Sequence, residues 1–218
     1  EHLLELKIEN ESSELLSSKY IDYIKSITTL STPHNGTTLS LIINNKYPAL
    51  QKLSAYAGVL SNIIFKDYYN FDLEQWNLKK TDDETYYQFI QRISTSDIQF
   101  TENSASWDLS VKGCHAFNEI SQSNQNTYYF SYSNSSSVLT KNRKTHKPSI
   151  DMSYYLRPAS ILIGSNEDID SLWQENDGIV NTISMDGPHD EKIIQYNNNP
   201  TPGIWQHMGK LYYDHHQM

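Results

Sequence analysis

The sequence has 218 residues, of which 37% are hydrophobic, and this length suits one domain or a large part of one. Its formal net charge of −9 argues against nucleic acid as a partner, because an acidic chain is repelled by phosphates. We see no basic run that would indicate binding to an anionic membrane surface. No stretch of about 18 consecutive apolar residues predicts a transmembrane helix. One cysteine, Cys114, excludes a disulfide within the chain.

The first third of the chain combines one short strand with helical patterns. Residues 13–24 mix apolar and charged positions at helical spacing, which predicts a helix. Residues 26–30 are β-prone, and the Asn-Gly pair at 35–36 predicts a turn after this strand. Residues 38–66 are the most apolar segment, and their hydrophobic side chains recur near helical spacing. We therefore expect short packed helices in 38–66.

The rest of the chain alternates between helical and β-prone patterns. Helices are predicted over 82–94 and 107–120, where apolar residues fall on one face. Strands are predicted over 127–132, 160–163 and 179–183. Strands separated by helices and long loops favour an α/β fold.

Several motifs occur in a fixed order and carry a family resemblance. They are SITTLSTPHNGTT (26–38), FDLEQW (71–76), WDLS (107–110), YYFSY (128–132), ENDGIVNTISM (175–185) and PGIW (202–205), followed by Gly209 and Asp214-His215. Any one of them is weak, but the ordered set resembles the large secreted lipases of staphylococci and thermophilic bacilli.

This resemblance implies an α/β-hydrolase fold and a role in ester hydrolysis. Residues 1–218 would be the C-terminal part of one lipase domain, with part of the mostly parallel sheet and its flanking helices. Segment 38–66 would be a lid over the acyl pocket. The substrate would be an acylglycerol or other lipid ester at a lipid–water interface, and the protein would be secreted. Without the resemblance, the helical stripe in 38–66 is more typical of an ordinary packed helix than of a lid.

Two residues match the acid and the base of a hydrolase triad. In α/β-hydrolases the triad runs serine, then acid, then histidine along the chain. Asp177 lies in a predicted loop, and His215 follows 38 residues later. The carboxylate of Asp177 would orient the imidazole of His215, which would act as general base and then acid. Without the resemblance, an Asp-Gly pair such as 177–178 is more often a simple turn.

Both assignments have a neighbour that competes with them. Asp214 adjoins His215, but side chains of adjacent residues point apart, so we expect Asp214 to be a structural acid. His216 is a second candidate base. The family motif places the histidine directly after an aspartate, which favours His215.

The nucleophile of such a triad is not in this sequence. The G-x-S-x-G motif occurs nowhere, and Gly164-Ser165-Asn166 lacks the flanking glycines. In the family this motif lies upstream of the strand that ends in Thr-Pro-His-Asn-Gly. The chain begins without a methionine or a signal peptide, so we expect residue 1 to be internal to a longer protein. The N-terminal remainder would supply the serine and the oxyanion-hole amides.

The resemblance also implies two metal sites. Relatives bind calcium through a backbone carbonyl that aligns with Asp151 and a carboxylate two residues after the histidine. Gln217 occupies the second position, so we expect a weak Ca²⁺ site because an amide brings no charge. Relatives also bind zinc, but most of those ligands would lie outside this chain. The remaining zinc ligand aligns with Glu102 or Asn103, and Glu102 is equally typical of a surface residue.

Two other functions compete with a lipase. One is a catalytically silent lipid-binding or interaction domain that retains the hydrolase scaffold. Intact Asp177 and His215 argue against it, since a silent scaffold needs neither. The other is a self-contained, non-enzymatic α/β domain, which leaves the ordered motifs unexplained.

Overall fold

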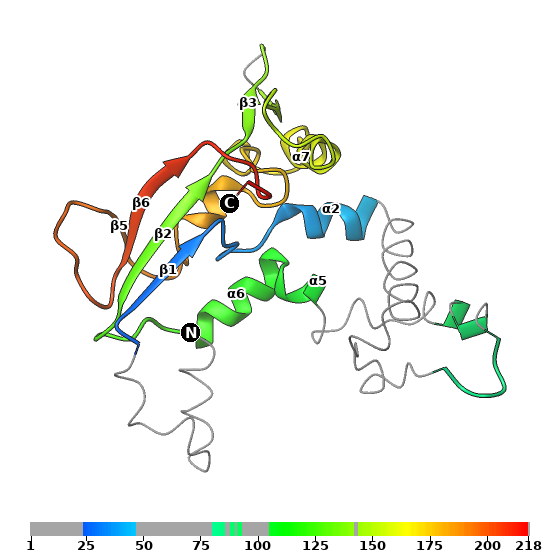
Figure 1. The fold of residues 1–218 in the computed structure, drawn as a ribbon, viewed down its shortest axis with the longest axis horizontal. Coiled ribbons are helices and arrows are strands. Elements are labelled where there is room, and N and C mark those ends of the chain that lie inside the picture. Colours follow the sequence, from blue (N-terminus) through cyan, green and yellow to red (C-terminus); the bar gives the residue numbers. More distant parts are fainter. Residues whose placement is uncertain are drawn as a thin grey trace. The chain divides into compact units, whose positions relative to one another are not determined.

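The computed structural model is drawn in Figure 1. The residues that it describes are 24–46, 80–85, 88–89, 91–92, 105–141 and 144–217. The chain divides into two compact units, and the larger comprises residues 1–39 and 109–218, whereas the smaller comprises residues 40–108. Among the described residues, no helix is long and apolar enough to cross a membrane.

The larger unit is organised around a parallel sheet. Its strands lie in the order β1 (Ser26–Leu30), β2 (Tyr128–Asn134), β6 (Trp205–Leu211) and β5 (Ile193–Gln195), and every pairing is parallel. The predicted strand over 26–30 is confirmed, and the strand predicted over 127–132 is present but extends to Asn134. Parallel strands must be joined by crossovers, and the connections from β1 to β2 and from β2 to β5 contain helices, whereas residues 196–204 join β5 to β6 without one. The α/β class is therefore confirmed.

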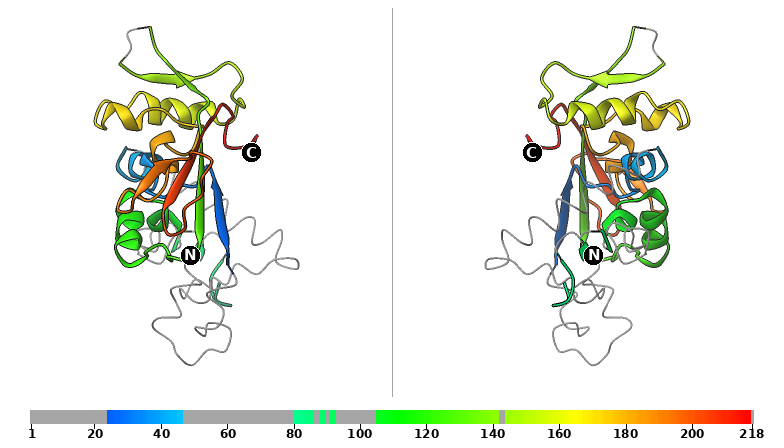
Figure 2. Two further views of the ribbon diagram at one scale, coloured as in Figure 1. Left: turned by 90° about the vertical axis from the view of Figure 1, so that its left-hand side faces the viewer. Right: turned by 90° about the vertical axis from the view of Figure 1, so that its right-hand side faces the viewer.

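The two faces of this sheet differ in burial. Along β2 the side chains of Tyr129, Ser131 and Ser133 are buried, whereas the residues between them are only half-buried. Because alternate side chains of a strand point to opposite faces, one face is covered and the other is not. Helix α6 (Val111–Ile120) and the 3₁₀ helix η6 (Thr182–Met185) lie on the same face (Figure 2). Trp205, fully buried, packs against Tyr129 on this face, with 5.0 Å between ring centroids.

The single helix predicted over 107–120 is wrong. Two helices occur instead, α5 (Ala105–Asp108) and α6, with a break at Leu109 and Ser110. The Ser110 hydroxyl accepts a hydrogen bond from the Gly113 N–H at 2.9 Å and so caps α6. A serine at such a position starts a new helix, because it satisfies an amide that has no partner in the first turn.

The strand predicted over 160–163 is also wrong, because these residues belong to helix α7 (Arg157–Gly164). Pro158 lies in its first turn, where the missing N–H of proline costs nothing. Ile163 is fully buried while Ile161 is half-exposed, so only one face of the apolar run packs inward. A short apolar run does not by itself distinguish a strand from a buried helix.

The third β-prone run, 179–183, forms no strand beyond an isolated bridge between Asn176 and Asn181. Its second half enters η6 instead. The Asn181 carbonyl accepts the Ser184 N–H at 2.9 Å, and its side-chain oxygen accepts the Thr38 N–H at 2.8 Å. Local turns and side-chain bonds therefore replace a strand ladder here.

Several elements were not predicted. They are β5, β6, the antiparallel hairpin of β3 (Ser137–Leu139) and β4 (His146–Pro148), and the 3₁₀ helix η5 (Ser171–Trp173). Strand β6, with the sequence WQHMGKL, contains no β-branched residue and only Trp205 from the aromatic group, so its composition gives little β signal.

Parts of the other expectations fall outside the described residues. The segment 38–66 begins with helix α2 (Thr38–Lys46), and residues 47–66 lie outside the described part. The lid assignment therefore stays a prediction. Residues 88–89 and 91–92 are helical, in agreement with the helix predicted over 82–94, whose other helical positions are not described. The helix predicted over 13–24 also lies almost entirely outside.

Candidate active site

Asp177 is held in a tight turn between η5 and η6. Its side chain is completely buried, and Oδ1 accepts hydrogen bonds from the N–H groups of Ile179 (3.0 Å) and Val180 (2.8 Å). Gly178 has φ +108, and a Cβ there would lie 2.9 Å from the Leu156 side chain. Glycine is therefore required for this turn. The turn fixes one carboxylate oxygen and leaves Oδ2 to face another group.

That group is His215, which lies in the loop after β6. Its Nδ1 is 2.8 Å from Asp177 Oδ2, and its backbone N–H donates to the Asp177 carbonyl at 3.0 Å. A carboxylate only accepts hydrogen bonds, so Nδ1 carries the proton. Nε2 of the neutral ring is then the basic atom. The expected hydrogen bond between these two residues is present, with both loops described.

The electrostatics of the pair suit a general base. The hydrogen bond that His215 donates to Asp177 raises the pKa of His215, burial opposes this effect, and the charges of Asp177 and Asp214 raise the pKa further. The His215 side chain is 35% exposed and that of Asp177 is fully buried. An imidazole paired in this way takes up a proton more readily than an isolated one.

Asp214, the rival carboxylate, is equally buried but is engaged elsewhere. Its Oδ2 accepts the Ser153 N–H at 2.6 Å, and its Oδ1 accepts the N–H groups of His216 (3.0 Å) and Gln217 (3.1 Å). Burial raises the pKa of Asp214, but these hydrogen bonds outweigh burial and the pKa falls below its ordinary value. Asp214 thus anchors the turn that carries His215, as expected of a structural acid.

His216, the rival base, points elsewhere. Its ring packs edge-on against Tyr155, with 5.5 Å between centroids, and the residue is exposed. The Asp177 carboxylate bonds His215 instead, so the geometry favours His215.

The Thr-Pro-His-Asn-Gly segment braces the Asp177 region. The Asn35 N–H donates to Ser184 Oγ at 3.0 Å, and Ser184 Oγ donates to the Gly36 carbonyl at 2.6 Å. Thr37 Oγ1 donates to the Ile179 carbonyl at 2.6 Å. Two motifs that lie about 140 residues apart in sequence therefore bind each other directly, and the turn of Asp177 is fixed from outside as well as from within.

His34, in the same segment, has a structural environment. Burial, with a contribution from the charge of His189, lowers its pKa to about 4. Thr29 Oγ1 donates to the Phe130 carbonyl and lies 3.0 Å from His34 Nε2, so the imidazole donates to the hydroxyl. The ring also packs edge-on against Trp205 at 4.5 Å. A neutral, buried imidazole with these partners packs the core.

The two residues expected at the calcium site are neighbours. Gln217 Nε2 donates to the Asp151 carbonyl at 3.5 Å, while Gln217 Oε1 accepts the Asp214 N–H at 3.1 Å. Both oxygens are neutral and already accept hydrogen bonds, whereas calcium requires several oxygen ligands, with carboxylates prominent among them. These two oxygens therefore offer at most a weak site for a calcium ion.

The zinc expectation is not tested, because Glu102 and Asn103 lie outside the described residues. Within the described part of the chain, no group of three or more His, Cys, Asp or Glu residues could hold a metal ion.

Sequence reasoning missed the residues that position the Asp177 turn, namely Asn35, Asn181 and Ser184. Small polar residues in loops have many ordinary roles, so their type gives no signal. Their presence inside the ordered motifs was the available signal, because each bonds a residue of another motif.

Comparison with known proteins identifies the family. The chain is 33% identical over 198 residues to a lipase of Staphylococcus hyicus, covering 90% of this chain and 30% of that protein. It is 29% identical over 196 residues to lipase 1 of Staphylococcus aureus, covering 90% and 28%. The chain thus spans less than a third of the length of these curated relatives.

Solved structures give the same result. The Staphylococcus hyicus lipase structure matches with a TM-score of 0.75 and 30% identity, over 97% of this chain and 54% of that one. EstA from Clostridium botulinum matches with a TM-score of 0.72 and 33% identity, over 89% and 49%. The sheet is therefore part of an α/β-hydrolase fold. The sequence profile of the lipase-like C-terminal domain matches residues 5–218, and the chain belongs to this family.

Proposed function

We propose that this chain is the C-terminal part of a secreted carboxylic ester hydrolase that cleaves acylglycerols. It supplies the acid, Asp177, and the base, His215, of a Ser-Asp-His triad. The observation that carries the proposal is the 2.8 Å bond between Asp177 Oδ2 and His215 Nδ1. The relatives named as lipases support the reaction class.

The geometry of the pair defines the role of each residue. With its Nδ1 proton held by Asp177, His215 takes the proton of the serine hydroxyl on Nε2 while the serine oxygen attacks the ester carbonyl. The imidazolium that forms is stabilised by the buried carboxylate. It then protonates the leaving alcohol, and an acyl-enzyme remains. Water, deprotonated by His215, releases the fatty acid and restores the serine.

The serine and the oxyanion hole would come from the N-terminal remainder of the protein. In the described part of the sheet, β1 pairs with β2 on one side and with no strand on the other. Its Ser26, Thr28 and Leu30 are exposed. A further parallel strand added at this edge would satisfy its backbone groups. The half-buried aromatic face of β2 would be covered by the same upstream part.

The substrate side of the proposal rests on segment 38–66 and on the relatives. We propose that this segment is a lid that opens at a lipid–water interface. Hydrogen exchange on a protein that includes the upstream part, with and without micelles, tests this idea. Unchanged protection in 38–66 would support ordinary packed helices.

Metal ions would have a minor role in the part of the protein that this chain provides. We propose a weak Ca²⁺ response at Asp151 and Gln217, since the ligands there would be a backbone carbonyl and a side-chain amide, which are both neutral. A Zn²⁺ contribution from Glu102 would need ligands from outside this chain. Neither ion enters the catalytic steps above.

The test uses two adjacent histidines as a matched pair. Hydrolysis of a p-nitrophenyl ester is measured for the protein with its upstream part, and for His215→Ala and His216→Ala variants. We expect His215→Ala to abolish turnover and His216→Ala to retain most of it. Equal activity of the two variants would remove the base assignment. Absence of turnover in the unmodified protein would favour the silent lipid-binding domain instead.

A further inference from the structure

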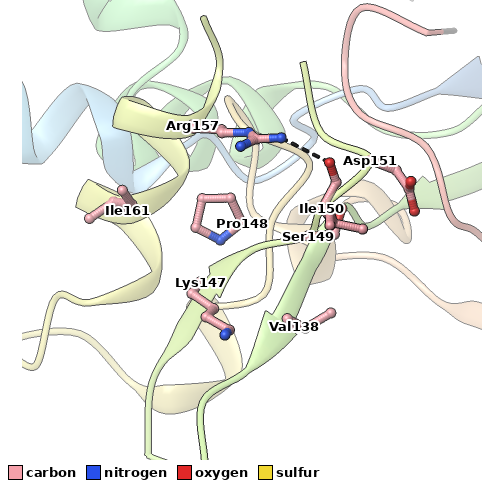
Figure 3. Close-up of a pocket in the computed structure, with 8 residues that line it drawn as sticks. All are labelled: Val138, Lys147, Pro148, Ser149, Ile150, Asp151, Arg157 and Ile161. Atoms are coloured by element: carbon pink, nitrogen blue, oxygen red, sulfur yellow. Dashed lines mark hydrogen bonds between the residues drawn. The ribbon is translucent and has the colours of Figure 1, made fainter. Parts of the chain in front are cut away.

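A pocket of about 700 Å³ lies between the β3–β4 hairpin and α7 (Figure 3), and neither Asp177 nor His215 lines it. Half of the eight residues that line it are aliphatic, and two cations lie among these side chains. The residues that matter here are Val138, Pro148, Ile150, Ile161, Lys147 and Arg157. Figure 3 shows Lys147 and Arg157 at opposite ends of the pocket. A pocket of this size and composition suits an amphiphilic ligand.

Large apolar side chains project from this region into solvent. Ile150 is 87% exposed, Leu139 55%, Ile161 49% and Val138 44%. Val138, Ile150 and Ile161 line the same pocket, so these three side chains belong to one surface, whereas Leu139 follows Val138 in β3 and points to the other face of the hairpin. Contiguous apolar exposure of this kind marks an interaction site.

The same surface is basic, although the chain as a whole has a net charge of −9. Between Ser137 and Gly164 the sequence has five lysine and arginine residues and one acidic residue, Asp151. The expectation that no basic run exists was therefore wrong, because four of these cations lie within residues 141–147 of the sequence. Figure 3 shows the Asp151 carboxylate pointing away from both Lys147 and Arg157. Glu175, which influences His146, is paired with Lys210 at 2.7 Å.

One of the two cations is held in place by backbone contacts. Arg157 donates to the carbonyls of Ile150 (2.8 Å) and Met152 (3.0 Å), which fixes its guanidinium at the rim. The backbone that carries Lys147 belongs to a hairpin in which the Thr140 N–H donates to the Thr145 carbonyl at 2.9 Å. Lys147 itself is exposed and has no ion-pair partner within the described residues. The guanidinium of Arg157 is thus preformed at the rim, and the charge of Lys147 stays accessible.

We propose that the β3–β4 hairpin and the start of α7 form a docking surface for an anionic lipid–water interface. Its cations would contact headgroup phosphates while Ile150 and Ile161, which line the same pocket, enter the boundary of the acyl chains. Exposed aliphatic side chains beside lysine and arginine favour binding to such an interface, because the apolar groups are buried and the cations are attracted to the anionic headgroups. An acidic protein partner would match the charge, but it would also need a cavity complementary to these protruding apolar side chains. The biological sense of the proposal rests on the proposed function, because a lipase must reach a lipid surface.

The test measures partition onto vesicles, which needs no ester hydrolysis. The protein with its upstream part is sedimented with phosphatidylcholine vesicles, with or without phosphatidylglycerol, at low and high salt. The test variant is Lys147→Gln with Ile150→Ser. The matched control is Lys192→Gln with Ile120→Ser, which also removes one exposed cation and one exposed isoleucine. Lys192 directly precedes β5, and Ile120 is the last residue of α6.

We expect binding that requires phosphatidylglycerol and weakens as salt rises. The test variant should lose about tenfold in partition, of which about fivefold comes from the charge, whereas the control changes less than about twofold. Equal losses in the two variants, or equal binding to both vesicle types, would overturn the proposal. So would no binding at all, which would mean that the upstream part covers this surface. Turnover of a soluble p-nitrophenyl ester by the unmodified protein is measured in parallel, so failure of the proposed function is seen separately.

Discussion

Two buried carboxylates flank the candidate base, and they differ in what their oxygens bind. Asp177 gives one oxygen to its own turn and the other to His215 Nδ1. Asp214 gives both oxygens to backbone N–H groups and bonds no imidazole. Both side chains have 0% exposure, so burial does not separate a catalytic from a structural aspartate here. What separates them is the partner of the second carboxylate oxygen, which is His215 Nδ1 for Asp177 and the Ser153 N–H for Asp214.

The largest effect is expected from Asp177→Asn. Asparagine retains an oxygen for the Ile179 and Val180 N–H groups, so the turn should survive. Its NH₂ would face Nδ1 and force the proton onto Nε2, which removes the base. Turnover of an ester by the protein with its upstream part should fall about 10⁴-fold, with little change in the urea midpoint. A fall of less than about tenfold in turnover would contradict the catalytic assignment.

The corresponding change at Asp214 should act on stability. Asp214→Ala leaves three partly buried N–H groups without their acceptor and should lower the free energy of unfolding by about 3 kcal/mol. Asp214→Asn keeps Oδ1 for His216 and Gln217 and loses only the bond from Ser153, so its effect should be smaller. Urea denaturation of the two variants measures this order. If Asp214→Asn instead removed activity without loss of stability, the two carboxylates would have exchanged roles.

The pH dependence tests the control of the His215 imidazole by Asp177. Because Asp177 raises the pKa of His215, the loss of activity on acidification should begin above the ordinary histidine value of about 6.5. The pair also stabilises the fold below about pH 6.5, and this contribution is lost as pH rises through the raised pKa. NMR titration of His215 in Asp177→Asn should give a lower pKa. An unchanged titration would show that the carboxylate does not control this imidazole.

The Asp177–His215 contact was predictable from sequence because it joins two members of an ordered set of motifs. The order of acid and histidine agreed with a hydrolase triad, and residues 26–30 had clear β character. The predicted surroundings of Asp177 were wrong, since 160–163 is helical and 179–183 enters a 3₁₀ helix. Apolar runs of four or five residues are compatible with either structure.

The parts of the structure that could not be predicted from the sequence depend on contacts between distant residues. Strand β6, which leads to His215, is polar and lacks β-branched residues, so its strand conformation depends on pairing with β2 and β5. The Asn35, Asn181 and Ser184 network likewise depends on contacts about 140 residues apart. Such long-range pairings leave little trace in local composition.

The smallest effect concerns the far end of the Asp214 turn. The Gln217 side chain accepts the Asp214 N–H and donates to the Asp151 carbonyl, so its amide links the turn to Asp151. A calcium ion bound by a carboxylate at position 217 could make the same link. Millimolar calcium should therefore raise the Tm by only about 1 °C, the shift expected near half-saturation of a weak site. Gln217→Asp restores a charged ligand and removes the amide donor, so it should lower Tm without calcium and increase the calcium response. Gln217→Ala is the control, because it removes the amide without adding charge. A shift in the unmodified protein that saturates at micromolar calcium would show that the amide does not replace the ion.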